Sequence, residues 1–303
     1  MESRIILSQA DFSQNNIGRY VEISELTKKV LAKQTQYEEG SNEAASLNTF
    51  LANLTTNGFI GGENPLIKCL IIPALASEHD ELLYDIAHLD SNGYPTDVMN
   101  PDEKTATNKA FEVDTDNGII VGLKRPTTAP DSSDLGKITV DVFQYGSGVS
   151  YPSFSYATYN RLGTVTGSAS AMYLQNLLSS TKFGYTKNQI QMKYGQNYPL
   201  TRNITPDETN GMKGFIGISY NETAKDFELL ADNITLGERT YDSEVPIAIN
   251  NDSKVNDFEL GKFANTNFTY ISVFALGNYL SSEQMAQFKG FVDTLMTDIH
   301  VKG

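Results

Sequence analysis

Residues 111–121 read Phe111-Glu112-Val113-Asp114-Thr115-Asp116-Asn117-Gly118-Ile119-Ile120-Val121, two apolar stretches separated by an Asn-Gly pair. Asn and Gly tolerate the positive φ angles of a tight two-residue hairpin turn. The segment therefore predicts two antiparallel strands that meet at Asn117-Gly118. Antiparallel strands need no helix between them, so this hairpin sets the expectation of a mainly β chain.

Further stretches of strand length lie on both sides of this hairpin, with Gly and Asn between them. Residues 66–72 are almost continuously apolar and end at Pro73, which cannot donate to a strand ladder. Residues 138–143 alternate apolar and polar side chains, with Ile138, Val140 and Val142 on the expected buried face. The other candidates are residues 154–159, 190–194, 215–220, 227–230, 255–260 and 270–276. Their spacing favours an antiparallel sandwich or jelly roll over a parallel sheet, which would require alternating long helices.

Helical periodicity appears at both ends of the chain. Ser24 is a candidate N-cap for a first helix, and a second helix is expected to end at Asn57-Gly58. Such a short helical pair cannot bury its apolar stripe alone, so we expect it to dock on the following domain or on its own copies in an oligomer. Near the C-terminus, Ser281 and Gln284 have the spacing of a capping box, which predicts a helix over residues 282–300.

The sequence between the first strand and the hairpin predicts one more short helix. Ser77 and Asp80 have the serine-x-x-acid spacing of a helix start, so residues 81–87 are expected to be helical. Beyond this point, strand patterns dominate until the C-terminal helix.

These elements divide the chain into three parts. Residues 1–23 are polar, with isolated large apolar side chains such as Phe12 and Ile17, and they predict an extended N-terminal attachment arm. Residues 24–60 are the expected helical coupling or oligomerisation region. Residues 61–303 are the expected β-sandwich domain, which includes the C-terminal helix.

Composition and charge exclude several classes of protein. The chain has 303 residues, with 37 acidic and 23 basic side chains and a formal charge of −14. No run of basic residues is longer than Lys28-Lys29, so binding to nucleic acid or to an anionic membrane is not expected. No apolar stretch reaches the roughly 18 residues of a membrane helix. The N-terminal residues lack the basic and apolar regions of a secretory signal, so synthesis in the cytoplasm is expected.

Few side chains are suited to metal or cofactor binding. The single cysteine, Cys69, excludes an internal disulfide and a cysteine-based zinc cluster. The histidines, His79, His88 and His300, lack the short spacings of a zinc site. No cofactor is therefore predicted, and calcium is the one metal that the acidic side chains near the hairpin end could hold.

The strongest indication of catalysis is the run Glu112-Val113-Asp114-Thr115-Asp116. On a regular strand its three carboxylates share one face, and retaining glycosidases use two carboxylates about 5 Å apart as nucleophile and acid. The preferred interpretation is a solvated hairpin end, since Asp and Asn are common beside turns for backbone reasons. Glu112, Asp114 and Asp116 are thus the catalytic candidates of the alternative.

Tyr151, Tyr156 and Tyr159 lie in a segment rich in aromatic side chains. Tyrosine rings beside amides and carboxylates suit sugar binding, so these three residues are the candidate ligand-binding platform. Core packing is the competing interpretation, because aromatic side chains dominate the interiors of sandwiches.

The order of segments carries a resemblance to a known family. A polar arm, a helical stretch, an apolar strand and a β-rich body follow one another, and the body closes with a strand and a capped helix. The stretches concerned are Leu26-Thr27-Lys28-Lys29-Val30-Leu31-Ala32-Lys33, Leu70-Ile71-Ile72-Pro73-Ala74-Leu75-Ala76, Tyr270-Ile271-Ser272-Val273-Phe274 and Leu280-Ser281-Ser282-Glu283-Gln284-Met285. In this layout the chain resembles bacteriophage virion proteins, namely head-fibre or decoration proteins of the crAss-like phages with a concanavalin A-like (laminin G-like) jelly roll.

The resemblance implies a structural, non-enzymatic protein that is assembled in the host cytoplasm and located in the virion. Its arm, with Phe12 and Ile17, would attach it to capsid or fibre components, by adding a strand to a neighbouring sheet. The helices would form a dimer or trimer, and the sandwich would project outward and bind surface glycans. The alternatives are a glycoside hydrolase that uses Glu112 with Asp114 or Asp116, and a plain carbohydrate-binding module.

Overall fold

The computed structural model describes residues 22–124, 126, 128–132, 135–139, 153–161, 170–176, 181–186, 188–194, 197–221, 223–224, 226–242, 257–259 and 270–301. The predictions for Phe12, Ile17 and Tyr151 lie outside these residues. The helices are α1 (Glu25–Leu31), α2 (Asn42–Thr56), α3 (Pro101–Thr105) and α4 (Ser282–Asp298), with two short 3-10 helices, η2 (Pro73–Leu75) and η3 (His79–Glu81). The strands are β1 (Ile67–Ile71), β2 (Tyr84–Leu89), β3 (Pro95–Asp97), β4 (Glu112–Asp116), β5 (Ile119–Lys124), β6 (Lys137–Thr139), β7 (Phe154–Asn160), β8 (Ser170–Asn176), β9 (Thr181–Thr186), β10 (Gln189–Tyr194), β11 (Asn197–Pro206), β12 (Gly214–Asn221), β13 (Asp226–Ala231), β14 (Ile234–Asp242), β15 (Asp257–Glu259) and β16 (Tyr270–Asn278).

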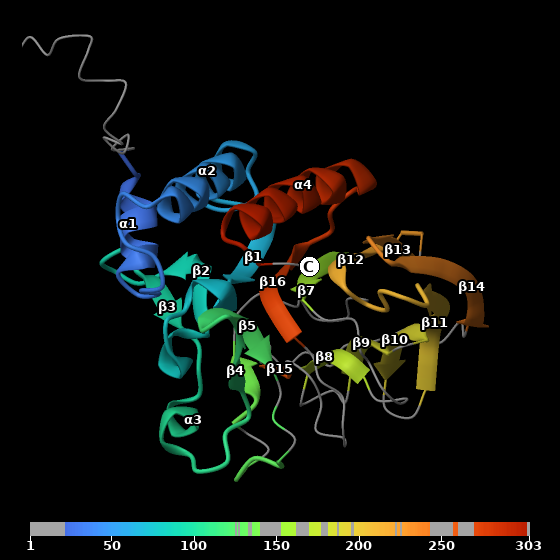
Figure 1. The fold of residues 1–303 in the computed structure, drawn as a ribbon. Coiled ribbons are helices and arrows are strands. Elements are labelled where there is room, and N and C mark those ends of the chain that lie inside the picture. The colour runs from blue at the N-terminus through green and yellow to red at the C-terminus, as the bar shows by residue number, and fades with distance from the viewer. Residues whose placement is uncertain are drawn as a thin grey trace, which may run out of the picture.

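The strands form two antiparallel sheets (Figure 1). The nine-stranded sheet has the order β13-β12-β7-β16-β1-β2-β3, with β5 paired to β16 and β4 paired to β5. The seven-stranded sheet has the order β14-β11-β10-β9-β8-β15-β6. Ile138, Ile190 and Ile204 of the seven-stranded sheet share one apolar core with side chains of the nine-stranded sheet. The expected mainly β, antiparallel sandwich with a C-terminal helix is therefore confirmed.

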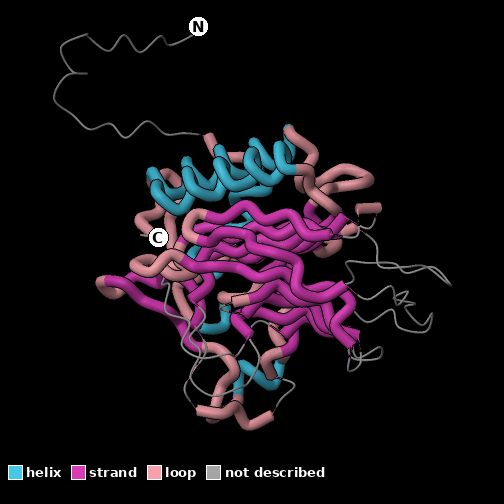
Figure 2. The backbone as a smooth tube through the Cα atoms, turned by 90° about the vertical axis from the view of Figure 1, so that its right-hand side faces the viewer, coloured by secondary structure: helices cyan, strands magenta, loops and turns pink. Residues whose placement is uncertain are grey.

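The nine-stranded sheet is buried on both of its faces. Along β7, Phe154 and Tyr156 belong to the core between the sheets, whereas Ala157 and Tyr159 belong to the core beneath the helices. Figure 2 shows the helices covering one side of the strands. A strand covered on both faces reads as a continuous apolar run, which is what residues 66–72 show.

The helical layer packs on this sheet within the same chain. Leu51 and Leu54 of α2 and Phe288 and Val292 of α4 are buried together with apolar side chains of the sheet. The capping box of Ser281 is present as predicted. Of the two docking arrangements expected for the short helical pair, the structure shows the one on the following domain, so the pair needs no second copy to cover its apolar stripe. The oligomeric state remains a prediction.

The core also extends into the predicted attachment arm. Ile23 is only 5% exposed and packs in the helix-covered core. The backbone N–H of Ser24 donates to Asn48 Oδ1 at 2.8 Å. A segment that attaches the protein elsewhere must therefore end before Ile23.

The helix predicted over residues 81–87 is wrong. Only the single turn η3 forms, and the chain then extends as β2. Tertiary contacts outweigh the local signal: β2 pairs with β1, Ile71 opposite Asp85, and the buried Asp85 carboxylate accepts the backbone N–H of Leu70. Glu81, expected to lie within the helix, binds the backbone N–H of Ser77 with its own carboxylate.

Candidate functional site

The three carboxylates of β4 do not form the predicted row. The hairpin itself is confirmed, with Asn117 and Gly118 at φ angles of 50° and 82°. However, the register of β4 and β5 shifts between Asp114 and Thr115, which interrupts the alternation of side chains along the strand. Glu112 is exposed and faces Lys124 at 3.5 Å, whereas Asp114 is buried.

Asp114 is fully engaged by an arginine. Arg161 Nε donates to Asp114 Oδ2 at 2.5 Å, and the terminal guanidinium nitrogen donates to Oδ1 at 2.6 Å. The guanidinium carbon also lies 5.6 Å from the ring centre of Tyr270. Hydrogen bonding to Asp114 raises the pKa of Arg161 further. Such a bidentate pair holds both carboxylate oxygens and ties the end of β7 to the β4–β5 hairpin.

The predicted tyrosine platform is wrong in its described part. Tyr156 and Tyr159 are 1% and 9% exposed, so neither presents a ring to a ligand at the surface. Residues three apart on a strand face opposite sides, and both sides of β7 are covered. The competing interpretation, core packing, therefore holds for Tyr156 and Tyr159.

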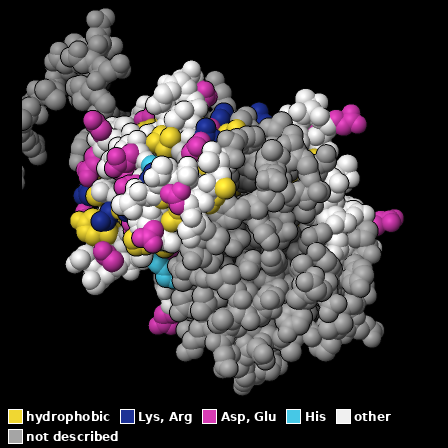
Figure 3. Space-filling model, turned by 90° about the horizontal axis from the view of Figure 1, so that it is seen from below, with side chains coloured by type: hydrophobic (Ala, Val, Ile, Leu, Met, Phe, Trp, Pro, Cys, Tyr) yellow, Lys and Arg dark blue, Asp and Glu magenta, His cyan; other side chains and the backbone are white. Residues whose placement is uncertain are grey.

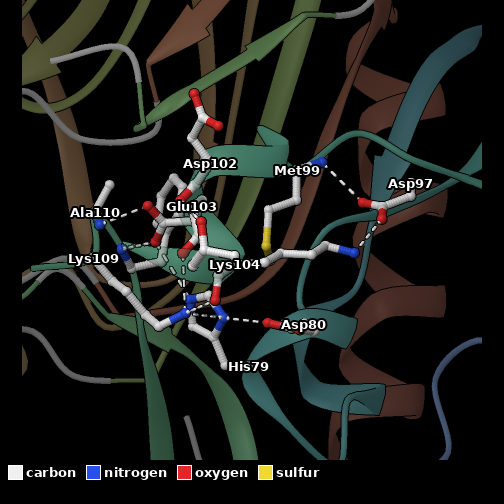
Figure 4. Close-up of polar contacts among 11 residues, drawn as sticks. His79, Asp80, Asp97, Met99, Asp102, Glu103, Lys104, Lys109 and Ala110 are labelled. Atoms are coloured by element: carbon white, nitrogen blue, oxygen red, sulfur yellow. Dashed lines mark hydrogen bonds and ion pairs between the residues drawn. The ribbon is translucent and has the colours of Figure 1, made fainter. Parts of the chain in front are cut away.

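A polar centre that sequence reasoning missed surrounds Glu103 of α3 (Figure 4). Its side chain is fully buried and accepts the backbone N–H groups of Ala110 and Phe111, each at 2.9 Å. His79 Nε2 lies 3.3 Å from the same carboxylate. Glu103 thereby fixes the loop that leads from α3 into β4.

The groups around Glu103 complete this centre. His79 Nδ1 lies 2.9 Å from Asp80 Oδ1, a contact that lowers the pKa of Asp80. Lys109 Nζ donates to the backbone oxygens of Glu103 and Lys104, at 3.0 and 2.9 Å. These oxygens belong to the last turn of α3, where a cation is favourable.

The chemistry available to this centre is limited. An imidazole between two carboxylates can pass a proton, but the Glu103 carboxylate is already held by two backbone N–H donors. The cluster therefore acts as a clamp between η3, α3 and the start of β4. No sequence signal marks Glu103, because an acid in the first turn of a helix is ordinary. Its burial depends on the loop that folds over it.

The described residues contain neither a metal-ligating cluster nor a membrane-spanning helix. No group of three or more His, Cys, Asp or Glu side chains converges there in a way that could hold a metal ion, so Glu112, Asp114 and Asp116 form no such set. In the same part of the chain, no helix combines the length and apolar character needed to cross a bilayer. Figure 3 shows acidic side chains spread over the described surface of one face.

A groove of about 260 Å³ lies between α2 and α4. Thr49 and Asn53 line it from α2, and Phe291 and Asp298 line it from α4. The lining mixes small polar and aromatic side chains, and it includes only one charged residue.

Comparison with known proteins gives no family. No family model and no curated protein matches the chain. Botulinum neurotoxin type C, whose cell entry depends upon interaction with two ganglioside molecules, is 17% identical with a TM-score of 0.43 over 80% of this chain and 53% of the toxin chain. A Trypanosoma rangeli sialidase is 10% identical with a TM-score of 0.35 over 86% of this chain. The chain spans about half the length of the toxin chain and 40% of the sialidase chain. At these TM-scores the likenesses assign neither family nor function.

Proposed function

We propose that this chain is a non-enzymatic virion protein of a tailed bacteriophage, a head fibre or capsid-attached decoration protein whose sandwich contacts surface glycans. The order of segments described above supports the virion role. One structural observation supports the non-enzymatic role: the buried carboxylates of the described residues, Asp85, Glu103 and Asp114, all bind groups of the protein itself. A glycosidase instead needs one carboxyl group free to give a proton and a second free to act as nucleophile or base.

The virion role is tested by deleting residues 1–21 and measuring incorporation into purified particles. This deletion keeps Ile23 and Ser24, which belong to the folded body. We expect the truncated chain to keep its melting temperature and to be lost from particles. Incorporation at the level of the full chain would contradict attachment through this segment.

The non-enzymatic role is tested by assaying release of reducing sugar from a panel of polysaccharides. Glu112→Gln is the matched variant, because Glu112 is the exposed carboxylate of β4. We expect no release from either protein. Release by the full chain that disappears in Glu112→Gln would establish the glycoside hydrolase instead.

A further inference from the structure

Helix α1 and the turn that follows it lie beside the β2–β3 hairpin, although the two are far apart in sequence (Figure 1). Lys29 of α1 and Lys33 of the turn approach the rings of Tyr84 and Tyr94 there. Lys33 Nζ lies 5.3 Å from the ring centre of Tyr94 and 5.9 Å from that of Tyr84. Lys29 Nζ lies 5.6 Å from the ring centre of Tyr94. We call these four residues the tyrosine–lysine bay.

The bay is held in a fixed shape by the hairpin turn. Lys29 Nζ donates to the backbone oxygen of Asn92 at 2.7 Å. Gly93 makes this approach possible: its φ angle is +77°, and a Cβ there would lie 2.6 Å from Lys29 Nζ. The turn is closed further by Asp90, which accepts the backbone N–H groups of Asn92 and Tyr94. Helix and hairpin are therefore locked together without the help of Lys33.

The ammonium of Lys33 and the two tyrosine hydroxyls of the bay make no polar contact with the described part of the protein. There, Lys33 Nζ has no hydrogen bond or ion pair, and neither do the hydroxyl groups of Tyr84 and Tyr94. All three side chains are half-buried. Burial first, and then the nearby Asp97 carboxylate, raise the pKa of Tyr84, so its hydroxyl remains a donor at neutral pH.

An ammonium group close to two aromatic rings, with its own donors unused by the described residues, selects a ligand of defined chemistry. The rings stabilise the ammonium group and offer apolar faces, while the ammonium and the hydroxyls offer donors to an anion. A pyranose that carries a carboxylate matches both features, with its C–H groups against a ring and its carboxylate on Lys33. A chain with a formal charge of −14 repels such a ligand elsewhere.

We propose that the tyrosine–lysine bay binds an acidic saccharide through a carboxylate on Lys33 and a sugar face on Tyr84 or Tyr94. The proposal rests on the proposed function only for the contact with glycans, and it is independent of the virion role. The Asp90 carboxylate interacts electrostatically with Lys33 and the Asp97 carboxylate with Tyr84, so the bay favours a ligand with a single carboxylate per sugar over a densely charged polyanion.

The test is calorimetric titration of the full chain with tetragalacturonate and with the uncharged galactose tetramer of the same length. We expect the acidic tetramer to bind and the neutral one to bind roughly tenfold more weakly or worse. Lys33→Met keeps the alkyl stem and removes the charge, so we expect a loss of similar size. Lys28→Met removes a charge of the same sign from the preceding helix α1, outside the bay, and should change the affinity less than about twofold.

Equal binding of both tetramers or unchanged affinity in Lys33→Met would overturn the proposal. So would complete displacement of tetragalacturonate by sodium sulfate at constant ionic strength, because that result identifies a general anion site. Melting temperatures of the variants show that each is folded. A chain that enters particles but binds no tetragalacturonate overturns the bay and leaves the virion role intact. A chain that binds tetragalacturonate but fails to enter particles overturns the virion role and leaves the bay intact.

Discussion

The buried carboxylates and the tyrosine–lysine bay differ in whether their polar groups have partners within the protein. Glu103 and Asp114 lie inside the protein, and protein donors hold both of their oxygens. In the bay, Lys33 is half-exposed and close to two rings, and the described residues give its ammonium no acceptor. Buried charge is tolerated only when it is paired, whereas unused donors at the surface are free for a ligand. The first region should therefore govern stability and the second should govern recognition.

The largest effect is expected from Glu103→Ala. The substitution removes the buried carboxylate that accepts the backbone N–H groups of Ala110 and Phe111, so we expect a loss of about 2 to 5 kcal/mol in the free energy of unfolding. Urea denaturation measures this loss. Glu112→Ala, at an exposed position of β4, is the control and should change stability by less than about 0.5 kcal/mol. Equal losses in the two variants would contradict the clamp.

A smaller loss is expected from Arg161→Met. Removing the guanidinium leaves the Asp114 carboxylate buried and unpaired, which costs about 2 to 3 kcal/mol because the pair retains some contact with solvent. Adding Asp114→Asn removes the stranded charge and should restore part of the loss, which urea denaturation of the single and double variants measures. If the two substitutions simply add, Asp114 and Arg161 are not coupled.

Gly93→Ala tests whether the contact between α1 and the β2–β3 hairpin affects ligand binding as well as stability. A non-glycine residue at φ +77° costs about 1 kcal/mol, and the new Cβ displaces Lys29 from the turn. Gly118→Ala is the matched control, because Gly118 has φ +82° and open space at its Cβ position. Gly93→Ala should lose more stability, because it also breaks the hydrogen bond of Lys29 with Asn92, and only Gly93→Ala should weaken binding of tetragalacturonate. Equal binding by the two variants would show that the lock between helix and hairpin does not shape the bay.

The smallest effect concerns the loop before β4. Hydrogen bonds from the backbone and side chain of Asn108, and from the backbone of Thr107, lower the pKa of Asp131. A lowered pKa in the folded state contributes stability above the ordinary pKa of about 4, and this contribution is lost as the pH falls through the folded value. Amide exchange at Thr107 and Asn108 should therefore accelerate, relative to intrinsic rates, as the pH falls below about 4 and through the lowered pKa of Asp131. In Asp131→Asn this acceleration should disappear.

The sequence predicted those elements well whose structure depends on residues close together in the chain. The Asn117-Gly118 hairpin, the strand at residues 66–72 and the capped C-terminal helix each depend on neighbours in sequence. The predicted helix at residues 81–87 failed because pairing with β1 outweighed a capping signal. Both faces of the nine-stranded sheet are covered, and the pattern of a single strand cannot show this. Tyr156 and Tyr159, on opposite faces of β7, are therefore both buried.

The sites were predicted less well because they are made by contacts between distant segments. Asp114 stands out in the sequence for its place in an acidic run, but its partner Arg161 lies 47 residues away. Glu103 looks like an ordinary residue of a helix start until the loop at Ala110 closes over it. The bay joins Lys33 to Tyr94 across a helix and a hairpin, and no local pattern connects the two.

The most direct test of the account is one NMR titration of the isotope-labelled full chain with tetragalacturonate, which locates the ligand and shows whether it is cleaved. We predict that the signals of Tyr84, Tyr94 and Lys33 shift while the tetramer stays intact after prolonged incubation. Shifts centred on Glu112 and Asp116, together with shorter products, would contradict the account and identify a glycoside hydrolase.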